Sequence, residues 1–350
     1  MKAMLYETSE GEAVRCTACR RYCTLKPGQT GFCGVRKNVD GALDLLVHSM
    51  PMGMNIDPIE KKPILHAYPG SRVLSFGTSG CNFACKFCQN YDMSQRRDIV
   101  GRKTTPEEIV ETAIRNGCQG IAYTYNEPTI FIEFAEEVGK IAHRNGLFNI
   151  FVTNGYETPE AVDSMKRFLD FATVDFKGNA STEFYRKYIS IGDPGSIFDT
   201  LSQLKETDIH VELTDLVIPE IGDNIHEARL MISHIVDIFG DDIPMCFLRF
   251  HPDYLLNELP VTPLVSLMEH YDLAREMGMN YVYIGNVPGI REQNTYCPGC
   301  RNLLVQRDRM RTVKVNLLPE STCPECGKSI PFILKNERTS IGKVDGLVFE

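Results

Sequence analysis

The fold of this chain is decided at residues 72–90, which read RVLSFGTSGCNFACKFCQN. The first part is a short, mostly apolar run, as expected of a buried β-strand, and it leads into a loop with cysteines spaced Cys-x3-Cys-x2-Cys. A [4Fe–4S] cube normally takes one thiolate for each of its irons. Cys81, Cys85 and Cys88 would therefore leave one iron open to another ligand. A zinc knuckle or reduced structural thiols are the alternatives, because any cysteine-rich loop can bind zinc.

Apolar runs and amphipathic segments alternate from residue 72 to about residue 285, which is the pattern of parallel strands joined by helices. Thr105, Thr158 and Thr262 are each followed by proline and predict helix starts. Strands with right-handed crossovers predict an α/β fold, a partial (β/α)6 barrel of the TIM type. The predicted strands are 73–78, 121–125, 149–153, 171–176, 210–218 and 245–250, with 281–284 as a candidate seventh.

Distinctive side chains come at or directly after the ends of these predicted strands. In a parallel barrel the carboxyl ends of the strands meet on one face, and binding sites are assembled there. We therefore expect one site at this face, beside the cysteine loop. Its candidate residues are Phe87, Asn126, Glu127, Thr153, Asn154, Asp175, Lys177, Ile218 and His251.

Composition fits an enzyme better than a general nucleic-acid-binding or membrane protein. The chain has 350 residues and a formal net charge of -9, so no basic excess is available to neutralise phosphates. No apolar run approaches the ~20 residues that a membrane span needs, and the residues after Met1 do not resemble a signal peptide. We expect a cytoplasmic protein without a membrane partner, for which nucleic acid is not the default partner.

The chain contains thirteen cysteines, and eleven of them fall in three clusters, which favours metal ligands over disulfides in such a protein. The N-terminal cluster consists of Cys16, Cys19, Cys23 and Cys33. Its thiolates suit either tetrahedral zinc or a closed iron–sulfur cluster. A second cluster would relay electrons, whereas zinc would fold a segment too short to build a core alone. Both interpretations stay open.

The C-terminal cluster consists of two Cys-x2-Cys pairs, Cys297 with Cys300 and Cys323 with Cys326. The interval between the pairs is slightly longer than in most zinc ribbons and carries β-type residues. The pattern predicts a zinc ribbon, with a rubredoxin-like iron site as the alternative. We thus expect a Cys-rich N-terminal extension over 1–70, a partial barrel over 71–290 and a zinc-ribbon-like lobe over 291–350.

Residues 72–255 resemble the pyruvate formate-lyase-activating branch of the radical SAM superfamily, whose members bind S-adenosylmethionine (SAM) at a [4Fe–4S] cluster. In that branch a Gly-Gly-Glu-Pro turn after the second strand holds the amino group of SAM, and the resemblance gives this role to Asn126 and Glu127. Asp175 and Lys177 match an Asp-x-Lys near the methionyl carboxylate. The resemblance therefore implies that these residues bind SAM.

The other candidates have less specific roles in such a site. Phe87 and Ile218 are expected along the adenine, with buried apolar packing as the alternative. His251 is the candidate for chemistry at the substrate, because imidazole exchanges a proton near neutral pH. A turn residue before proline is the alternative for His251. Thr153 and Asn154 follow the third predicted strand and are expected in the same pocket.

Nearly the whole chain resembles the AmmeMemoRadiSam system radical SAM enzymes. The resemblance rests on the N-terminal cysteines, on the cysteine loop, and on the segments GFCGVR at 31–36, PIEKKP at 58–63 and RFHPDY at 249–254. It implies an association with proteins of the AMMECR1 and Memo families and leaves the reaction unstated.

The residue patterns and the two family resemblances leave three classes of function. The favoured one is a radical SAM enzyme that takes an electron from a low-potential donor of the flavodoxin or ferredoxin type. It would abstract hydrogen from a small molecule or from a substrate presented by a partner. The second is a glycyl-radical activase, although Val152 and Thr214 replace an aspartate and an arginine of the activating enzyme. The third is a non-catalytic electron carrier or zinc-ribbon interaction protein.

Overall fold

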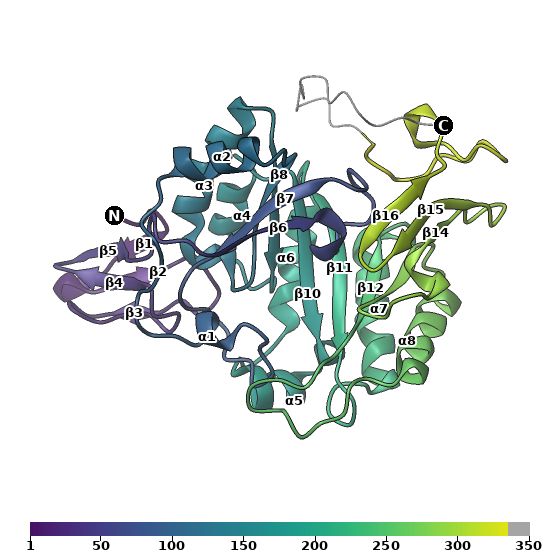
Figure 1. Cartoon of the computed structure of the whole chain (residues 1–350). Helices are drawn as coiled ribbons and strands as arrows, with labels where there is room; N and C mark the ends of the chain where they lie inside the picture. Colours follow the sequence, from purple (N-terminus) through teal and green to yellow (C-terminus); the bar gives the residue numbers. More distant parts are fainter. Residues whose placement is uncertain (335–350) are drawn as a thin grey trace.

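The structure, a computed structural model, describes residues 1–334, so the part of the expected C-terminal lobe at 335–350 lies outside the described residues. Its centre is an eight-stranded sheet in the order β13-β12-β11-β10-β9-β8-β7-β6 (Figure 1). Neighbours from β7 to β13 pair in parallel, and β6 joins β7 in the antiparallel direction. The strands are β6 Met52–Pro58, β7 Arg72–Gly77, β8 Gly120–Tyr123, β9 Phe148–Thr153, β10 Phe171–Lys177, β11 His210–Val217, β12 Met245–Arg249 and β13 Val282–Gly285.

The structure confirms a mixed α/β fold with a large parallel sheet. Each predicted strand is present with its ends shifted by at most two residues, and the candidate seventh strand is β13. The sequence analysis missed β6. Most side chains of this edge strand are exposed or half-buried, so its sequence lacks the apolar run that marks a buried strand.

Helices connect the parallel strands, and α2, α3 and α8 pack against the strands next to them. Thr105 and Thr158 cap α2 and α4 by accepting backbone N–H groups, as predicted. Thr262 does not cap α8; its hydroxyl donates to the Val217 carbonyl at 2.7 Å instead. No helix among residues 1–334 combines the length and apolarity needed to cross a membrane. The helices are α1 Tyr91–Ser94, α2 Pro106–Arg115, α3 Ile132–Arg144, α4 Pro159–Met165, α5 Thr182–Phe184, α6 Gly195–Lys205, α7 Ile225–Phe239 and α8 Leu264–Glu276.

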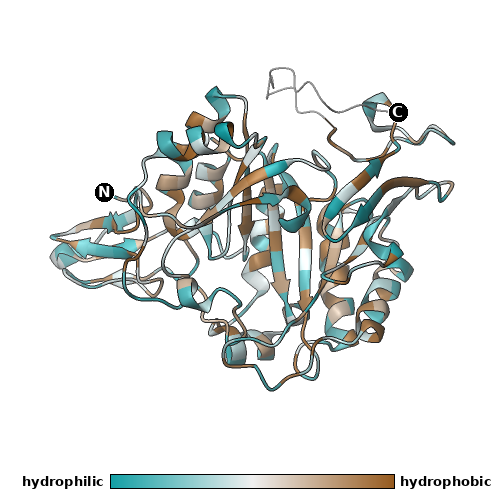
Figure 2. Cartoon of the chain, viewed as in Figure 1, coloured by the Kyte–Doolittle hydropathy of each residue, from teal (hydrophilic) through white to brown (hydrophobic). Residues whose placement is uncertain are grey.

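Hydrophobic segments occur along the parallel strands, interrupted in β10 and β11 by polar residues (Figure 2). Strands buried on both faces read as continuous hydrophobic runs, which is why the sequence marks them clearly. Aromatic rings extend the core across neighbouring strands: the ring centroids of Phe76 and Tyr123 lie 5.3 Å apart, and those of Tyr123 and Phe151 lie 5.5 Å apart. This packing fixes the strand ends that carry the site.

The N-terminal region lies on the opposite side of the sheet from the C-terminal lobe (Figure 1). One buried ion pair ties it to the barrel: Arg36 Nη2 lies 2.5 Å from a carboxylate oxygen of Glu133 on α3. Arg36 Nε also donates to the Ile130 carbonyl at 2.9 Å. The region consists of two small antiparallel sheets, with β1 Tyr6–Thr8, β2 Val14–Cys16 and β3 Thr24–Leu25 in one and β4 Arg36–Val39 and β5 Ala42–Leu45 in the other.

The C-terminal lobe is a small antiparallel sheet that docks on the barrel through a buried histidine. His66 lies 3.0 Å from the Pro331 carbonyl through Nδ1 and 2.6 Å from the Tyr283 hydroxyl through Nε2. Its ring stacks on Phe332 with centroids 4.6 Å apart. Within residues 291–334 the strands are β14 Thr295–Tyr296, β15 Leu303–Asp308 and β16 Arg311–Val315.

Candidate functional site

The cysteine loop, residues 78–90, joins β7 to α1 at the carboxyl end of β7. Three backbone hydrogen bonds hold it to later segments of the chain. Ala84 N donates to the Ile189 carbonyl at 3.0 Å, and Lys86 N donates to the Tyr188 carbonyl at 2.9 Å. The Lys86 carbonyl accepts from Leu255 N at 2.9 Å. These bonds fix the loop to the segments around residues 188–189 and 255.

The three thiols of this loop, Cys81, Cys85 and Cys88, are buried or half-buried. Burial raises the pKa of the Cys85 thiol to about 12, while the positive charge of Lys177 acts in the opposite direction. The backbone N–H of Phe83 donates to Cys81 Sγ at 3.4 Å. A bound metal would favour the thiolate form that burial alone disfavours.

The thiols open into a cavity of about 480 Å³ at the carboxyl ends of the strands. This volume lies in the range of small-molecule and cofactor sites, roughly 300–1,000 Å³. The cavity brings together most of the residues that the sequence singled out. Its lining includes Cys81, Cys85, Phe87, Cys88, Asn126, Glu127, Thr153, Asn154, Asp175 and Lys177.

Asn126 fastens the start of the cysteine loop to the end of β8. Its Nδ2 donates to the carbonyls of Thr78 at 2.9 Å and Gly80 at 2.7 Å, and its Oδ1 accepts from Thr78 N at 3.2 Å. A side chain on Gly77 would meet the Thr124 carbonyl at 2.5 Å. The loop therefore crosses the β8 end in close contact, and the amide of Asn126 sets its path.

Glu127 is buried, and both of its carboxylate oxygens are used inside the protein. One accepts from the hydroxyls of Thr129 at 2.7 Å and Thr153 at 2.9 Å, and the other accepts from Asn154 N at 2.8 Å. Both hydroxyls also contact the buried carboxylate of Glu157. Each hydroxyl has one proton, so it cannot donate to both carboxylates at once, and a proton on one of the carboxyl groups would relieve the shortage of donors.

Burial raises the pKa of Glu127 to about 8, with the charge of Glu157 acting in the same direction. Burial also raises the pKa of Glu157. Both shifts favour a proton on this buried pair of carboxyl groups. Through its hydrogen bonds to Thr129 and Asn154, Glu127 links the ends of β8 and β9. The sequence signal for Glu127 was a family motif, and nothing in it pointed to Glu157.

Asp175 and Lys177 project from the end of β10 into the cavity lining. Lys177 Nζ lies 3.9 Å from the Asp175 carboxylate and donates to the Asp175 carbonyl at 3.1 Å. The Thr214 hydroxyl donates to the same carboxylate at 2.6 Å. Burial raises the pKa of Asp175, and the charge of Lys177 opposes the shift. The pair offers one cation and one acceptor group to a ligand.

Residues 76–234 match the Radical SAM superfamily. The uncharacterized protein MJ0808 of Methanocaldococcus jannaschii is 42% identical over 336 residues, which cover 95% of this chain and 99% of that protein. The chain belongs to the radical SAM superfamily.

Two solved structures are similar to parts of this chain. A radical SAM methyltransferase from Sphaerobacter thermophilus is 15% identical with a TM-score of 0.50, over 62% of this chain and 67% of that chain, a likeness of fold alone. A domain of pyruvate-formate lyase-activating enzyme from Bacteroides vulgatus is 14% identical with a TM-score of 0.42, over 48% of this chain and 99% of that chain. Membership of the radical SAM superfamily implies a [4Fe–4S] cluster and SAM, and the cavity with its three thiols fits both.

Two predicted residues of this radical SAM chain lie outside the cavity lining. Ile218 is fully buried, and its backbone exchanges hydrogen bonds with Gly222. His251 is exposed, and its Nδ1 lies 2.9 Å from the Pro252 carbonyl. Phe87 does line the cavity, and its ring packs on Phe184 with centroids 5.7 Å apart.

The radical SAM cavity also has a wall that the sequence analysis did not assign. Lys62 is buried with its Nζ 2.8 Å from the Asp57 carboxylate and 4.8 Å from the centre of the Tyr125 ring. The Tyr125 hydroxyl donates to Asp57 at 3.0 Å. The segment 58–63 carried a family signature, but nothing in its sequence placed Lys62 at the cavity. Its contact with Asp57 depends on the pairing of the missed strand β6.

The N-terminal cysteines gather around a second, smaller cavity of this radical SAM chain. Cys16, Cys19, Cys23 and Cys33 all line it. The turn that carries Cys16 and Cys23 closes with a backbone hydrogen bond from Cys16 N to the Cys23 carbonyl at 2.9 Å. This turn docks behind β9, where Arg20 Nε donates to the Glu157 carbonyl at 2.7 Å.

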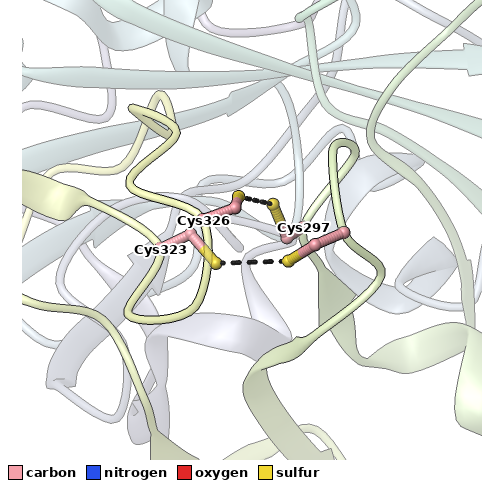
Figure 3. A group of neighbouring side chains, drawn as sticks. Cys297, Cys323 and Cys326 are labelled. Carbon is pink, nitrogen blue, oxygen red and sulfur yellow. Dashed lines mark hydrogen bonds between the residues drawn. The ribbon is translucent and has the colours of Figure 1, made fainter.

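The C-terminal cysteines form a compact group at the tips of two turns (Figure 3). The sulfurs of Cys297 and Cys326 lie 3.5 Å apart, and those of Cys300 and Cys323 lie 3.6 Å apart. All four ligand atoms lie within 4.8 Å of one another. The group is therefore able to hold one metal ion.

Proposed function

We propose that this protein is a radical SAM enzyme that cleaves SAM reductively and abstracts hydrogen from a small molecule or a substrate presented by a partner. Cys81, Cys85 and Cys88 would hold the [4Fe–4S] cluster. When bound and reduced, the cluster supplies one electron to the sulfonium group of SAM, which yields a 5′-deoxyadenosyl radical. One observation carries the proposal: the three thiols open into the cavity that Asp175 and Lys177 also line.

The charged residues of the cavity suit the methionyl end of SAM. In this proposal Lys177 pairs with the carboxylate of SAM, because a partly buried cation gains most from a charged partner. Asp175 and the end of β8 accept from the ammonium group. Asn126 and Glu127 are positioning residues, supported by their hydrogen bonds to the cysteine loop and to Asn154.

Other residues are proposed for the adenine and substrate ends of the cavity. Phe87 is proposed to line the adenine, since it directly precedes Cys88 and lines the cavity. Ile218 would shape that wall by packing, and Thr153 and Asn154 would close it through their bonds to Glu127. His251 is proposed to exchange a proton at the substrate. Its loop contacts the cysteine loop through Leu255 N and the Lys86 carbonyl.

The two ends of the chain would serve this enzyme in different ways. Sulfur spacings of 3.5 and 3.6 Å at the C-terminal cluster are close to the edge, about 3.8 Å, of a tetrahedron with zinc–sulfur bonds of ~2.3 Å. We therefore propose a structural zinc and a zinc-ribbon-like lobe beside a partial barrel of the TIM type.

A reduced flavodoxin or ferredoxin would supply electrons. The family resemblance supports AMMECR1 and Memo proteins as partners.

The test of the reaction is removal of the three cluster thiols. The Cys81→Ala/Cys85→Ala/Cys88→Ala variant, reconstituted anaerobically with iron and sulfide, should form no 5′-deoxyadenosine from SAM under reduction. Cys118→Ala is the matched control, because this buried thiol lies outside all three clusters. Undiminished cleavage in the triple variant would refute the assignment.

SAM binding itself can be tested at Lys177. The Lys177→Met variant should bind SAM at least about tenfold more weakly, equivalent to ~1.4 kcal/mol, in calorimetry on the reconstituted enzyme. Lys103→Met, at an exposed position outside the cavity, should leave the affinity unchanged. Equal affinities of the Lys177→Met and unmodified proteins would remove Lys177 from the SAM site.

A further inference from the structure

The cavity of the N-terminal cluster lies where the N-terminal region meets the barrel. Its walls come from both parts: the four cysteines belong to the N-terminal region, and Asn82 and Ile130 belong to the barrel. Cys16, Cys19 and Cys33 are buried, and Cys23 is half-buried. None of these four cysteines forms a disulfide. Free thiols that line one cavity in this way are a common arrangement for a metal centre.

The spacing of the thiols distinguishes two kinds of centre. Thiolates on a single zinc lie about 3.8 Å apart, as the ~2.3 Å bond length requires. Within residues 1–334, groups of three or more ligand atoms within 4.8 Å of one another occur only at the C-terminal cluster. The N-terminal sulfurs do not form such a group, and neither do those of the cysteine loop, which holds a cube in this superfamily. A cube needs the wider spacing because each thiolate binds a different iron.

Two buried N–H groups on the cavity wall lack a protein partner. Arg36 Nη1 and Asn82 Nδ2 have no hydrogen bond, although Arg36 is 1% exposed and Asn82 is fully buried. An unpaired buried donor costs about 1–3 kcal/mol. The sulfides and thiolates of an iron–sulfur cluster are acceptors, and hydrogen bonds to them help to set its reduction potential. Both donors would be satisfied by a cluster in this cavity.

The N-terminal cysteines and the cysteine loop are direct neighbours. Arg21 Nε donates at 2.5 Å to the carbonyl of Asn82, the residue after Cys81. A side chain on Gly80 would meet the Cys33 carbonyl at 2.1 Å, so the two cysteine-bearing backbones touch at this point. Asn82 therefore lines the N-terminal cavity and adjoins a ligand of the radical SAM cluster. Because the two cysteine-bearing backbones touch, electron transfer between centres bound to them needs no large movement of the chain.

We propose that Cys16, Cys19, Cys23 and Cys33 hold a second iron–sulfur cluster that delivers electrons to the radical SAM cluster. A reduced flavodoxin or ferredoxin gives one electron to the N-terminal cluster and is oxidised by one electron. The N-terminal cluster passes that electron to the cluster of the cysteine loop and returns to its oxidised state. The relay rests on the proposed radical SAM function, whereas the second cluster does not.

The second cluster is tested where the first cannot form. The Cys81→Ala/Cys85→Ala/Cys88→Ala variant, reconstituted anaerobically, should retain iron and acid-labile sulfide in equal amounts. It should give an electron paramagnetic resonance signal after reduction with dithionite. Adding Cys23→Ser, at the least buried ligand, should remove most of this iron and sulfide, whereas adding Cys118→Ala should not. Circular dichroism checks that both variants fold.

The outcomes separate the two proposals. Two results would overturn the second cluster, whatever the activity of the unmodified enzyme. In one, the triple variant contains no sulfide and loses about one equivalent of zinc on Cys23→Ser; in the other, it contains no sulfide and loses no metal. Asn82→Leu in the triple-alanine background should lower the midpoint potential of the remaining cluster, because a donor to its sulfurs stabilises the reduced, more negative form. An unchanged potential would contradict the role of Asn82.

The relay is tested in the otherwise unmodified chain. There, Cys23→Ser should slow 5′-deoxyadenosine formation with flavodoxin at least about tenfold, and an unchanged rate would contradict the relay.

Discussion

The C-terminal and N-terminal cysteine clusters each have four thiols, but different parts of the chain place them. At the C-terminal cluster two similar turns position the sulfurs: Arg301 N donates to the Cys297 carbonyl at 2.9 Å, and Gly327 N donates to the Cys323 carbonyl at 2.9 Å. At the N-terminal cluster the wall is completed by residues of the barrel, among them Asn82. A metal held by the C-terminal cysteines would stabilise one lobe only, because the turns of that lobe supply all its ligands. A metal held by the N-terminal cysteines would also affect the cysteine loop, because the loop residue Asn82 forms part of the same cavity wall.

The largest effect should come from breaking the self-contained cluster. Cys323→Ser should release about one equivalent of zinc and unfold the lobe, since structural zinc contributes on the order of 10 kcal/mol to small metal-dependent folds. Hydrogen exchange should then become fast in β15 and β16. Cys246→Ala is the control, because this thiol packs in the same core without being a ligand. Retained zinc in Cys323→Ser would show that the metal is held elsewhere.

A smaller but clear effect should follow from loosening the N-terminal region. Arg36→Met leaves Glu133 buried without its partner, which typically costs about 3–5 kcal/mol. Urea unfolding should show the loss, with iron measured in parallel so that variants are compared at equal loading. Arg36→Met/Glu133→Gln should recover much of the stability. If the double variant is no more stable than the single one, the ion pair is not what attaches this region.

The smallest effect should be a pH dependence at the docking contact of the C-terminal lobe. Burial lowers the pKa of His66 from 6.5 to about 4. Between these values the unfolded chain binds a proton that the folded chain does not, so stability is lost as the pH falls from 6.5 towards 4. His66→Gln should flatten this part of the stability curve, by up to about 3 kcal/mol between pH 7 and pH 4. Parallel curves for the two proteins would contradict the assignment.

The sequence predicted the parallel strands well because burial on both faces leaves an apolar run in most of them. It predicted Thr105 as a helix cap correctly and Thr262 wrongly. The local signals of the two threonines are alike, but Thr262 is fully buried and its hydroxyl bridges Val217 and Phe250. Tertiary contacts overrode the local preference there.

The candidate site was predictable where a motif spans a few residues and not where partners come from distant segments. The spacing of the cysteine loop marked its three thiols directly. Glu127 was recognisable from its turn, but its protonation depends on Glu157, thirty positions later. Lys62 reaches the cavity because β6 pairs with β7 and carries Asp57 to that wall. Such partners are fixed by folding in three dimensions, which spacing along the chain does not encode.

Two buried carboxylates, one on α3 and one on β11, bear on how this protein can be shortened. Glu133 on α3 needs Arg36, and Glu212 on β11 accepts the backbone N–H groups of Leu65 at 2.9 Å and His66 at 2.7 Å. A truncated chain limited to 76–234, the residues that match the superfamily, would keep both carboxylates and lose every one of these partners. We therefore expect the segment 76–234 to be unstable by itself, because its buried carboxylates depend on residues of the flanking region before it.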